Sequence, residues 1–207
     1  TEYISNGSTR NYWTNYNINV SANGYNSSGL NVNITQSSNY TFNLSSSNIA
    51  PAITTVYLSA NVTPTEATTV SVNVNFTVTD TDGGGTINFS SAKINFTKSG
   101  EGIRENNSCS LVTTQNATNT RNFTCNVQMW YFDGAGTWNI AAYAEDNSAV
   151  NAQNTTTIFN YDTLQAFVLY PSLINFSNPI IGQQNVPTNE ATKLNNTGNY
   201  NANINIT

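Results

Sequence analysis

The chain contains no histidine, two cysteines and one methionine, and 17 of its 207 residues are charged. Without histidine, and with both cysteines bridged, no Ser–His or Cys–His catalytic pair can form. No Gly-rich phosphate loop follows a predicted strand and opens a helix. The carboxylates of Asp133, Glu145 and Asp146 are available for a glycosidase pair, but no surrounding pattern selects them. We therefore expect no enzyme and no cofactor.

The scarcity of charge also limits the partners. Six basic residues against eleven acidic ones give a net charge of -5, which leaves no basic stripe for nucleic acid or anionic lipid. No apolar run approaches the ~18 residues that a membrane span needs. The chain starts at Thr1 without Met, which predicts a removed signal peptide, and the two cysteines suit an oxidising compartment. We expect an extracellular, cell-surface protein with no membrane span.

Apolar and polar residues alternate along most of the chain, most clearly between Cys109 and Asn147. The faces of two predicted strands there carry Phe123, Cys125, Val127, Met129 and Tyr131, then Trp138, Ile140, Ala142 and Ala144. A period of two with a Gly-rich break predicts neighbouring strands. Cys109 has the same parity as Leu111, so a Cys109–Cys125 disulfide across neighbouring strands is predicted; it stabilises by roughly 3 kcal/mol on the chain-entropy model.

The alternation divides the chain into three parts. Residues 1–50 contain three predicted strands, at 16–20, 30–34 and 40–44, which is too little to stand alone. Residues 53–161 contain six to eight, with a bulge or turn near Ser90 and Ser91 and a polar loop at 98–108. Residues 162–207 contain a strand at 164–170, short pieces at 173–176 and 180–181, and a last strand at 200–206. This third part is an incomplete β-sandwich.

The run YFDGAGTWNI at 131–140 resembles the corner before the penultimate strand of immunoglobulin-like (Ig-like) surface domains. It differs by one inserted Gly and by Trp138 in place of Tyr, so the hydroxyl of a tyrosine corner is absent. The resemblance covers residues ~53 to 161 and carries no activity with it. It implies an all-β fold with two Ig-like sandwich domains, one complete and one partial. A strand from another segment or subunit completes the partial one.

Asparagine dominates the polar surface: the chain has 38 Asn and 50 Ser or Thr, which predict about nine Asn-X-Ser/Thr sequons by chance. Seventeen are present, at Asn6, Asn19, Asn26, Asn33, Asn39, Asn43, Asn61, Asn75, Asn88, Asn95, Asn106, Asn116, Asn122, Asn154, Asn175, Asn195 and Asn205. We predict heavy N-glycosylation. The alternative is that Asn and Thr simply fill the outer faces of strands in a charge-poor protein.

The middle residue of most sequons is apolar. On a strand, residues i and i+2 face the same way, so Asn and its hydroxyl partner point to solvent while the residue between them points to the core. Five sequons have Phe there, and in four of them the side chains predicted to be buried are Phe76, Phe89, Phe96 and Phe123. Glycans would then lie on the outer faces of the sheets, where a bulky polar group costs least.

The two partial sheets, 1–50 and 162–207, leave edge amides and an apolar face unpaired. In size, sequon load and charge-poor β composition the chain resembles the subunits of archaeal cell-surface threads, a kind of pilus. That resemblance implies a homopolymer assembled by donor-strand complementation. The candidate donor strands are 12–21 and 200–207, and we favour the N-terminal one. The alternative is a non-filamentous S-layer or adhesin-type ectodomain that contacts other cells or surfaces.

Three weaker site hypotheses remain. Asp80, Asp82, Glu145 and Asp146 at strand ends are weak calcium candidates, although Asp in turns more often makes local hydrogen bonds. The aromatic residues Tyr12, Trp13 and Tyr16 are compatible with sugar stacking. A Lys–Asn isopeptide crosslink would have to use Lys93, Lys98 or Lys193, and no spacing selects one of them.

Overall fold

The computed structural model describes residues 3–7, 9–12, 15–33, 38–58, 61–201 and 203, without the side chains of 3–6 and 9–12. The described part consists almost wholly of antiparallel strands. It separates into two compact units, Thr1–Ile49 and Ala50–Thr207. Each unit is described by itself.

The N-terminal unit contains two hairpins. Strand β1 (Tyr3–Asn6) pairs with β2 (Thr9–Tyr12), and β3 (Asn15–Val20) pairs with β4 (Ser28–Asn33). The predicted strands at 16–20 and 30–34 correspond to β3 and β4, with residue 34 outside the described residues. The strand predicted at 40–44 is wrong: that stretch is described and irregular, and the nearby Ser46 makes only an isolated bridge to Tyr25.

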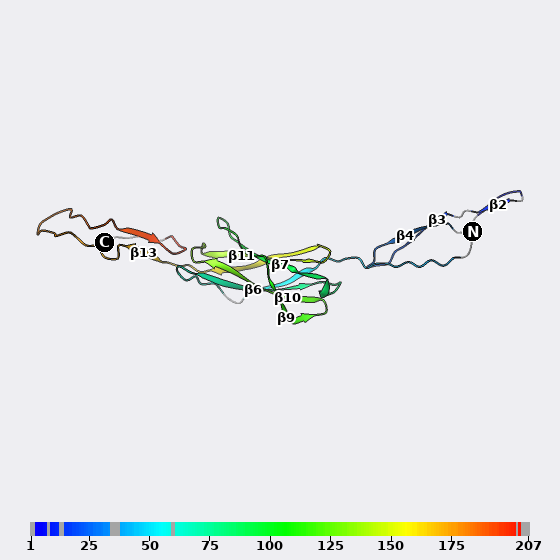
Figure 1. Cartoon of the computed structure of the whole chain (residues 1–207), viewed down its shortest axis with the longest axis horizontal. Coiled ribbons are helices and arrows are strands. Elements are labelled where there is room, and N and C mark those ends of the chain that lie inside the picture. Colours follow the sequence, from blue (N-terminus) through cyan, green and yellow to red (C-terminus); the bar gives the residue numbers. More distant parts are fainter. Residues whose placement is uncertain are drawn as a thin grey trace. The chain divides into compact units, whose positions relative to one another are not determined.

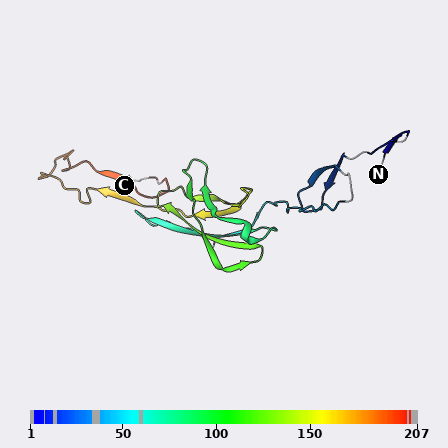
Figure 2. The same cartoon turned by 45° about the vertical axis from the view of Figure 1, so that its right-hand side comes forward.

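The second unit contains a complete β-sandwich of two four-stranded sheets (Figure 1; Figure 2 gives a second direction). One sheet has the order β5-β6-β10-β9, and the other has the order β12-β11-β7-β8. Their bounds are β5 Ala52–Leu58, β6 Thr69–Thr79, β7 Ile87–Thr97, β8 Arg104–Asn106, β9 Ser110–Ala117, β10 Thr120–Trp130, β11 Gly136–Asp146 and β12 Asn151–Tyr161. A 3-10 helix, η1 (Gly84–Thr86), joins β6 to β7.

The strand order itself defines the fold. Taken in chain order as A, B, C, C′, D, E, F and G, the eight strands form an A-B-E-D sheet and a C′-C-F-G sheet. This is the immunoglobulin arrangement. The predicted all-β, Ig-like sandwich is therefore confirmed. Two features depart from antibody domains: the disulfide joins Cys125 of β10 to Cys109, the residue just before β9 of the same sheet, instead of linking the two sheets, and the buried Trp138 lies on strand F.

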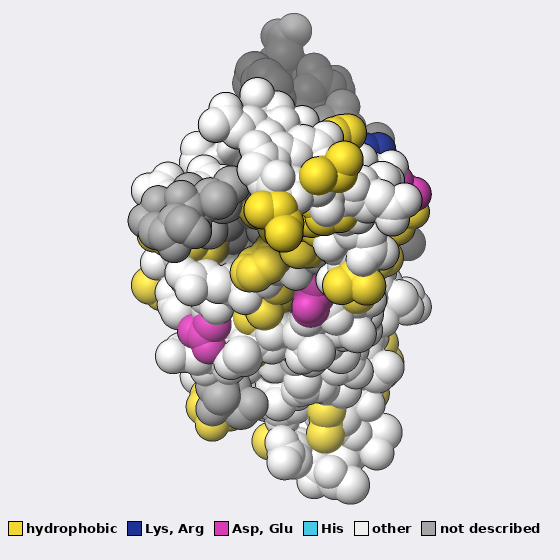
Figure 3. Space-filling model, turned by 90° about the vertical axis from the view of Figure 1, so that its left-hand side faces the viewer, with side chains coloured by type: hydrophobic (Ala, Val, Ile, Leu, Met, Phe, Trp, Pro, Cys, Tyr) yellow, Lys and Arg dark blue, Asp and Glu magenta, His cyan; other side chains and the backbone are white. Residues whose placement is uncertain are grey.

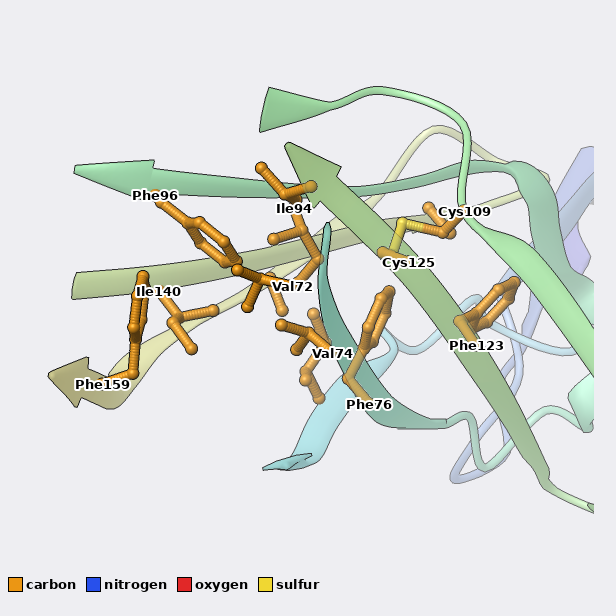
Figure 4. Packing of buried hydrophobic residues seen from close by; sticks show 14 of the residues in the cluster. Val72, Val74, Phe76, Ile94, Phe96, Cys109, Phe123, Cys125, Ile140 and Phe159 are labelled. Carbon is orange, nitrogen blue, oxygen red and sulfur yellow. A yellow bond between two sulfur atoms is a disulfide. The ribbon is translucent and has the colours of Figure 1, made fainter. Parts of the chain in front are cut away.

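Alternate residues of both sheets meet in one core (Figure 4). Val74, Phe76 and Ile94 are almost wholly buried, as are all the inward positions predicted for β10 and β11 from Phe123 to Met129 and from Trp138 to Ala144. Phe76 and Phe123 stack with centroids 5.3 Å apart. Cys109 and Cys125 form the predicted disulfide, with Cα atoms 4.6 Å apart.

Strand β7 contains the irregularity predicted near Ser90 and Ser91. Its register against β11 shifts between Tyr143 and Glu145, and the Ser91 hydroxyl accepts a 2.7 Å hydrogen bond from the Glu145 amide. The expected burial of Phe89 is wrong, because the shift changes which residues face inward and leaves that ring 41% exposed. The loop predicted at 98–108 likewise contains β8, which pairs with β7.

The C-terminal segment of the second unit forms a separate two-stranded sheet. Strand β13 (Phe167–Tyr170) pairs antiparallel with β14 (Lys193–Asn196), and Phe176 makes an isolated bridge to Thr188. Sequence patterning predicted β13 but missed β14. Residues 202 and 204–207 of the last predicted strand lie outside the described residues. Within the described part of the chain, no helix has the length and apolar character of a membrane crossing.

Candidate assembly and glycan sites

Strands β13 and β14 form a sheet whose two faces are both exposed within the described part of the chain. All eight of their residues are exposed, including Phe167 at 68% and Tyr170 at 59%. A two-stranded hairpin is marginally stable on its own, and its outer edges have unpaired N–H and C=O groups. This sheet therefore has open edges and exposed faces, as the predicted incomplete sandwich would.

The chain between β13 and β14 adds further exposed apolar side chains. They are Leu173, Ile174, Phe176, Ile180 and Ile181. Figure 3 faces the end of the unit that carries this segment and shows hydrophobic side chains among uncharged polar ones, with few charges between them. Contiguous exposed apolar surface of this kind marks an interaction site.

The turn after β14 anchors this sheet to the sandwich. The side-chain amide of Asn199 donates 3.0 Å hydrogen bonds to the carbonyl oxygens of Asp133 and Asp162, and its oxygen accepts one from the Leu164 amide. At Gly198, a side chain would collide with the backbone of Leu164. The hydroxyl of Thr197 donates to the carboxylate of Glu66. No pattern in the sequence shows that these residues bind the sandwich.

The corner between β10 and β11, to which Asn199 binds, is itself tightly held. The buried Asp133 carboxylate accepts hydrogen bonds from Arg104, whose Nε lies 2.9 Å from Oδ2, and from the Trp130 amide at 2.7 Å. The pairing with Asp133 raises the pKa of Arg104. The indole N–H of Trp138 donates to the Gly134 carbonyl oxygen at 3.0 Å, so the corner is tied without the tyrosine of the family pattern.

A tyrosine from β12 also supports this corner. The Tyr161 hydroxyl donates a 3.0 Å hydrogen bond to the Trp130 carbonyl oxygen, and its ring is fully buried. Burial, with a contribution from the negative charge of Asp133, raises the pKa of Tyr161 to about 12. The corner therefore provides a rigid base for the C-terminal sheet.

None of the described sequon asparagines is buried. An asparagine that carries a bulky glycan must be accessible to solvent, so all of them meet this condition. The exposed ones are Asn19, Asn26, Asn33, Asn39, Asn43, Asn61, Asn75, Asn116, Asn175 and Asn195. The half-buried ones are Asn88, Asn95, Asn106, Asn122 and Asn154. The side chains of Asn6 and Asn205 lie outside the described residues. Glycosylation itself stays a prediction.

Three of the half-buried sequon asparagines use their side-chain nitrogen in the fold. Asn106 Nδ2 donates to the Asn126 carbonyl oxygen at 2.8 Å, and Asn154 Nδ2 donates to that of Ile53 at 3.1 Å. Asn122 Nδ2 donates to the Gln115 carbonyl oxygen. A glycan is attached through this same nitrogen. Among the exposed sequons, the nitrogen of Asn26 also donates, to the Ser45 hydroxyl at 3.2 Å.

The calcium candidates use their carboxylates within turns. Asp80 accepts hydrogen bonds from the Asp82 amide at 2.9 Å and the Thr86 hydroxyl at 2.8 Å, and Asp146 accepts from the amides of Ser148 and Val150. The Glu145 carboxylate accepts the Tyr143 hydroxyl. Over the described ranges, no three acidic or cysteine side chains gather as a metal site would require. The carboxylates of Asp80 and Asp146 are thus used in local turn bonding.

Two further hypotheses from the sequence concern sugar stacking and a lysine crosslink. In the proposed sugar-stacking cluster, the Tyr12 side chain and Trp13 lie outside the described residues, and Tyr16 on β3 is 36% exposed. Of the lysines considered for a crosslink, Lys93 has its ammonium 4.1 Å from the centroid of the Tyr143 ring. A different aromatic pair, Trp130 and Phe132, is stacked and about half exposed. Trp130 is the last residue of β10, and Phe132 lies in the turn that follows it.

Comparisons with known proteins add little to this geometry. No family model and no curated protein matches the chain. A solved structure described as the PKD domain of an M14-like peptidase from Thermoplasmatales archaeon SCGC AB-540-F20 is similar at 17% identity and a TM-score of 0.31. The match covers 56% of this chain and 99% of that one. At that level it carries no argument, and the fold assignment rests on the strand order.

Proposed function

We propose that the chain is a structural subunit of an extracellular, N-glycosylated cell-surface filament that assembles head to tail by β-strand complementation. One observation carries the proposal: a complete sandwich continues into a two-stranded sheet whose eight residues are all exposed. A sheet of that kind is a template for a strand from another chain.

The C-terminal sheet has an open edge and exposed apolar side chains, and addition of one strand would cover both. The added backbone pairs with an open edge, and its apolar side chains cover residues such as Phe167 and Leu169. Burial of apolar surface contributes about 25 cal/mol per Å², so covering several such side chains outweighs the cost of ordering one short strand. Interactions repeated at every junction of a polymer hold the filament together.

The N-terminal unit is the favoured donor. Its strands form only two-stranded sheets, and β3 alternates polar asparagines with Tyr16, Ile18 and Val20. Such a strand can place its apolar residues on an open sheet face while its asparagines face solvent. The N-terminal unit therefore contains a strand with the alternating apolar and polar residues that an added strand needs.

The sequon distribution supports an extracellular location. Ten of the described sequon asparagines are exposed and none is buried, so glycans fit without disturbing the core. Because the chain has only 17 charged residues, attached sugars would supply much of its solubility.

Electron microscopy of the protein purified from its natural source, with intact mass on the same sample, tests this function. Long filaments resistant to SDS, with a subunit mass well above the 22.4 kDa of the polypeptide, are expected. Monodisperse particles would contradict the filament. A mass equal to that of the polypeptide would contradict glycosylation.

A second function has an observation of its own. The half-exposed stack of Trp130 on Phe132, with centroids 5.7 Å apart, favours recognition of another surface by an adhesin-type ectodomain. Monodisperse protein that loses attachment to cells in the Trp130→Ala variant would favour this alternative over the filament.

A further inference from the structure

The outer face of the β5-β6-β10-β9 sheet contains an open groove of about 490 Å³. Tyr57 of β5 lies along one side and Gln115 of β9 along the other, with Asn75, Thr77 and Asn122 of the two central strands between them. No charged residue lines the groove. Val112 and the buried residues Phe76 and Phe123 complete the lining. Amides, hydroxyls and the exposed Tyr57 ring make a surface that suits a neutral polyhydroxylated ligand.

Two sequons face each other in this groove. Strands β6 and β10 are antiparallel, and their register places Asn75 opposite Thr124 and Thr77 opposite Asn122. The sequons 75–77 and 122–124 are therefore paired head to tail, so that each asparagine lies beside the threonine of the other. Their surroundings nevertheless differ.

Both polar atoms of the Asn122 carboxamide make hydrogen bonds within the sheet. Its Nδ2 donates to the Gln115 carbonyl oxygen, and its Oδ1 accepts a 2.6 Å hydrogen bond from the Thr77 hydroxyl. The side chain is half-buried. A sugar on Nδ2 would have to fit between β6 and β9 beside these bonds, and losing a buried hydrogen bond costs stability.

Asn75 has the opposite surroundings. Its side chain is exposed, and its cross-strand neighbour on β5 is Tyr57, whose ring is 62% exposed. Directly opposed residues of antiparallel strands have Cβ atoms about 5 Å apart on the same face. The Tyr57 ring is therefore within reach of the first sugar on Asn75.

We propose that Asn75 is glycosylated, that its first sugar packs on the ring of Tyr57 within the groove, and that Asn122 carries no glycan. This inference rests on the glycosylation that forms part of the proposed function. In the transfer, a separate glycosyltransferase uses a phosphate-activated glycan: a bond forms between Asn75 Nδ2 and sugar C1, the bond from C1 to the phosphate oxygen breaks, the amide loses one proton, and the phosphate leaves.

The contact follows from the shape of a sugar ring. A pyranose presents C–H groups on its faces and hydroxyls at its rim, so it packs flat on an aromatic ring while its hydroxyls bond to polar neighbours. In the groove those neighbours are Gln115 and Thr124, both on the far side from Tyr57. The glycan would thus cover the outer face of the sheet as well as solubilise it.

Glycopeptide mass spectrometry of the protein from a glycosylating host tests site occupancy. We expect a glycan on the peptide containing Asn75 and none on the peptide containing Asn122. The Asn75→Gln variant should lose the mass of one glycan, whereas Asn122→Gln should lose none. Occupied Asn122, or unoccupied Asn75 beside other occupied sequons, would overturn this inference alone. A protein with no glycan at any sequon would overturn the proposed glycoprotein as well.

A double-mutant cycle tests the sugar contact. Tyr57→Ala should lower the melting temperature of the glycosylated protein by about 2–4 °C, a range typical of one lost contact in a chain of this size. The same substitution should have little effect in the Asn75→Gln background, and Tyr57→Phe, which keeps the ring, should have little effect in either. Equal losses from Tyr57→Ala in both backgrounds would overturn the contact.

Discussion

The hydroxyl of Thr77 donates a 2.6 Å hydrogen bond to the carboxamide oxygen of Asn122, directly across the central pair of strands β6 and β10. Asn73, which is not part of a sequon, donates from Nδ2 to the Thr124 hydroxyl at 3.0 Å. The Asn-X-Thr sequence 75–77 on β6 is thus paired with the Asn-X-Thr sequence 122–124 on its antiparallel neighbour β10. In this pair the asparagine and threonine side chains bond to each other across the sheet.

The bond between Thr77 and Asn122 can be tested apart from any glycan. In protein from a host that adds no glycans, Thr77→Val should lower the free energy of unfolding by about 1 kcal/mol, since the Asn122 oxygen loses its donor. Thr77→Ser keeps the hydroxyl and should be nearly neutral. Urea denaturation of the three proteins makes the comparison, and equal stability of the Val and Ser variants would contradict it.

The disulfide should contribute a larger share of stability. Replacing both Cys109 and Cys125 by Ala removes a cross-link with a sequence separation of 16 residues, and the expected cost is about 3 kcal/mol on the chain-entropy model. Chemical denaturation of the oxidised protein and of the double variant measures this difference. Unchanged stability would mean that the cross-link does not restrict the unfolded chain.

Removing the Asn199 side chain should loosen the attachment of the C-terminal sheet without unfolding the sandwich. In Asn199→Ala the carbonyl groups of Asp133 and Asp162 and the amide of Leu164 stay in place, but their hydrogen bonds to the Asn199 side chain are lost. Hydrogen exchange at the Leu164 amide should accelerate by about tenfold or more, with the sandwich core unaffected. Asn201→Ala, at an exposed position nearby, is the matched control. Gly198→Ala should act like Asn199→Ala, because its new methyl group meets the Leu164 backbone.

Stability should fall at high pH through Tyr161. Its folded-state pKa of about 12 lies above the ordinary value of 10.0, so folding favours the protonated hydroxyl. This contribution is complete below pH ~10 and is lost as the pH rises towards 12, by about 2–3 kcal/mol. Denaturant titrations across that window should show a smaller loss for Tyr161→Phe than for the natural protein. Parallel losses in the two would contradict the assignment.

The long alternating stretches were the predictable part of the fold. The inward faces of β10 and β11 follow directly from sequence parity, as do the disulfide and the bulge in β7. Phe89 could not be placed, because the bulge changes the register at that point and the sequence does not specify its direction. Strand β14 was missed because Lys193 and Asn196 give it no alternating apolar pattern.

The candidate sites depend on pairing between distant segments, which one sequence does not reveal. The seventeen sequons were visible, but the difference between Asn75 and Asn122 arises from strands β5 and β9 on opposite sides of the groove. Likewise, the bonds from Asn199 to residues 133 and 162 could be found only from the fold.

Assembly by strand complementation is tested most directly by shortening the proposed donor. Electron microscopy should compare the full chain with one that begins at Asn23 and therefore lacks residues 12–21. The account predicts filaments from the full chain and isolated subunits from the shortened one. Filaments of equal length from the chain that begins at Asn23 would contradict the N-terminal donor strand.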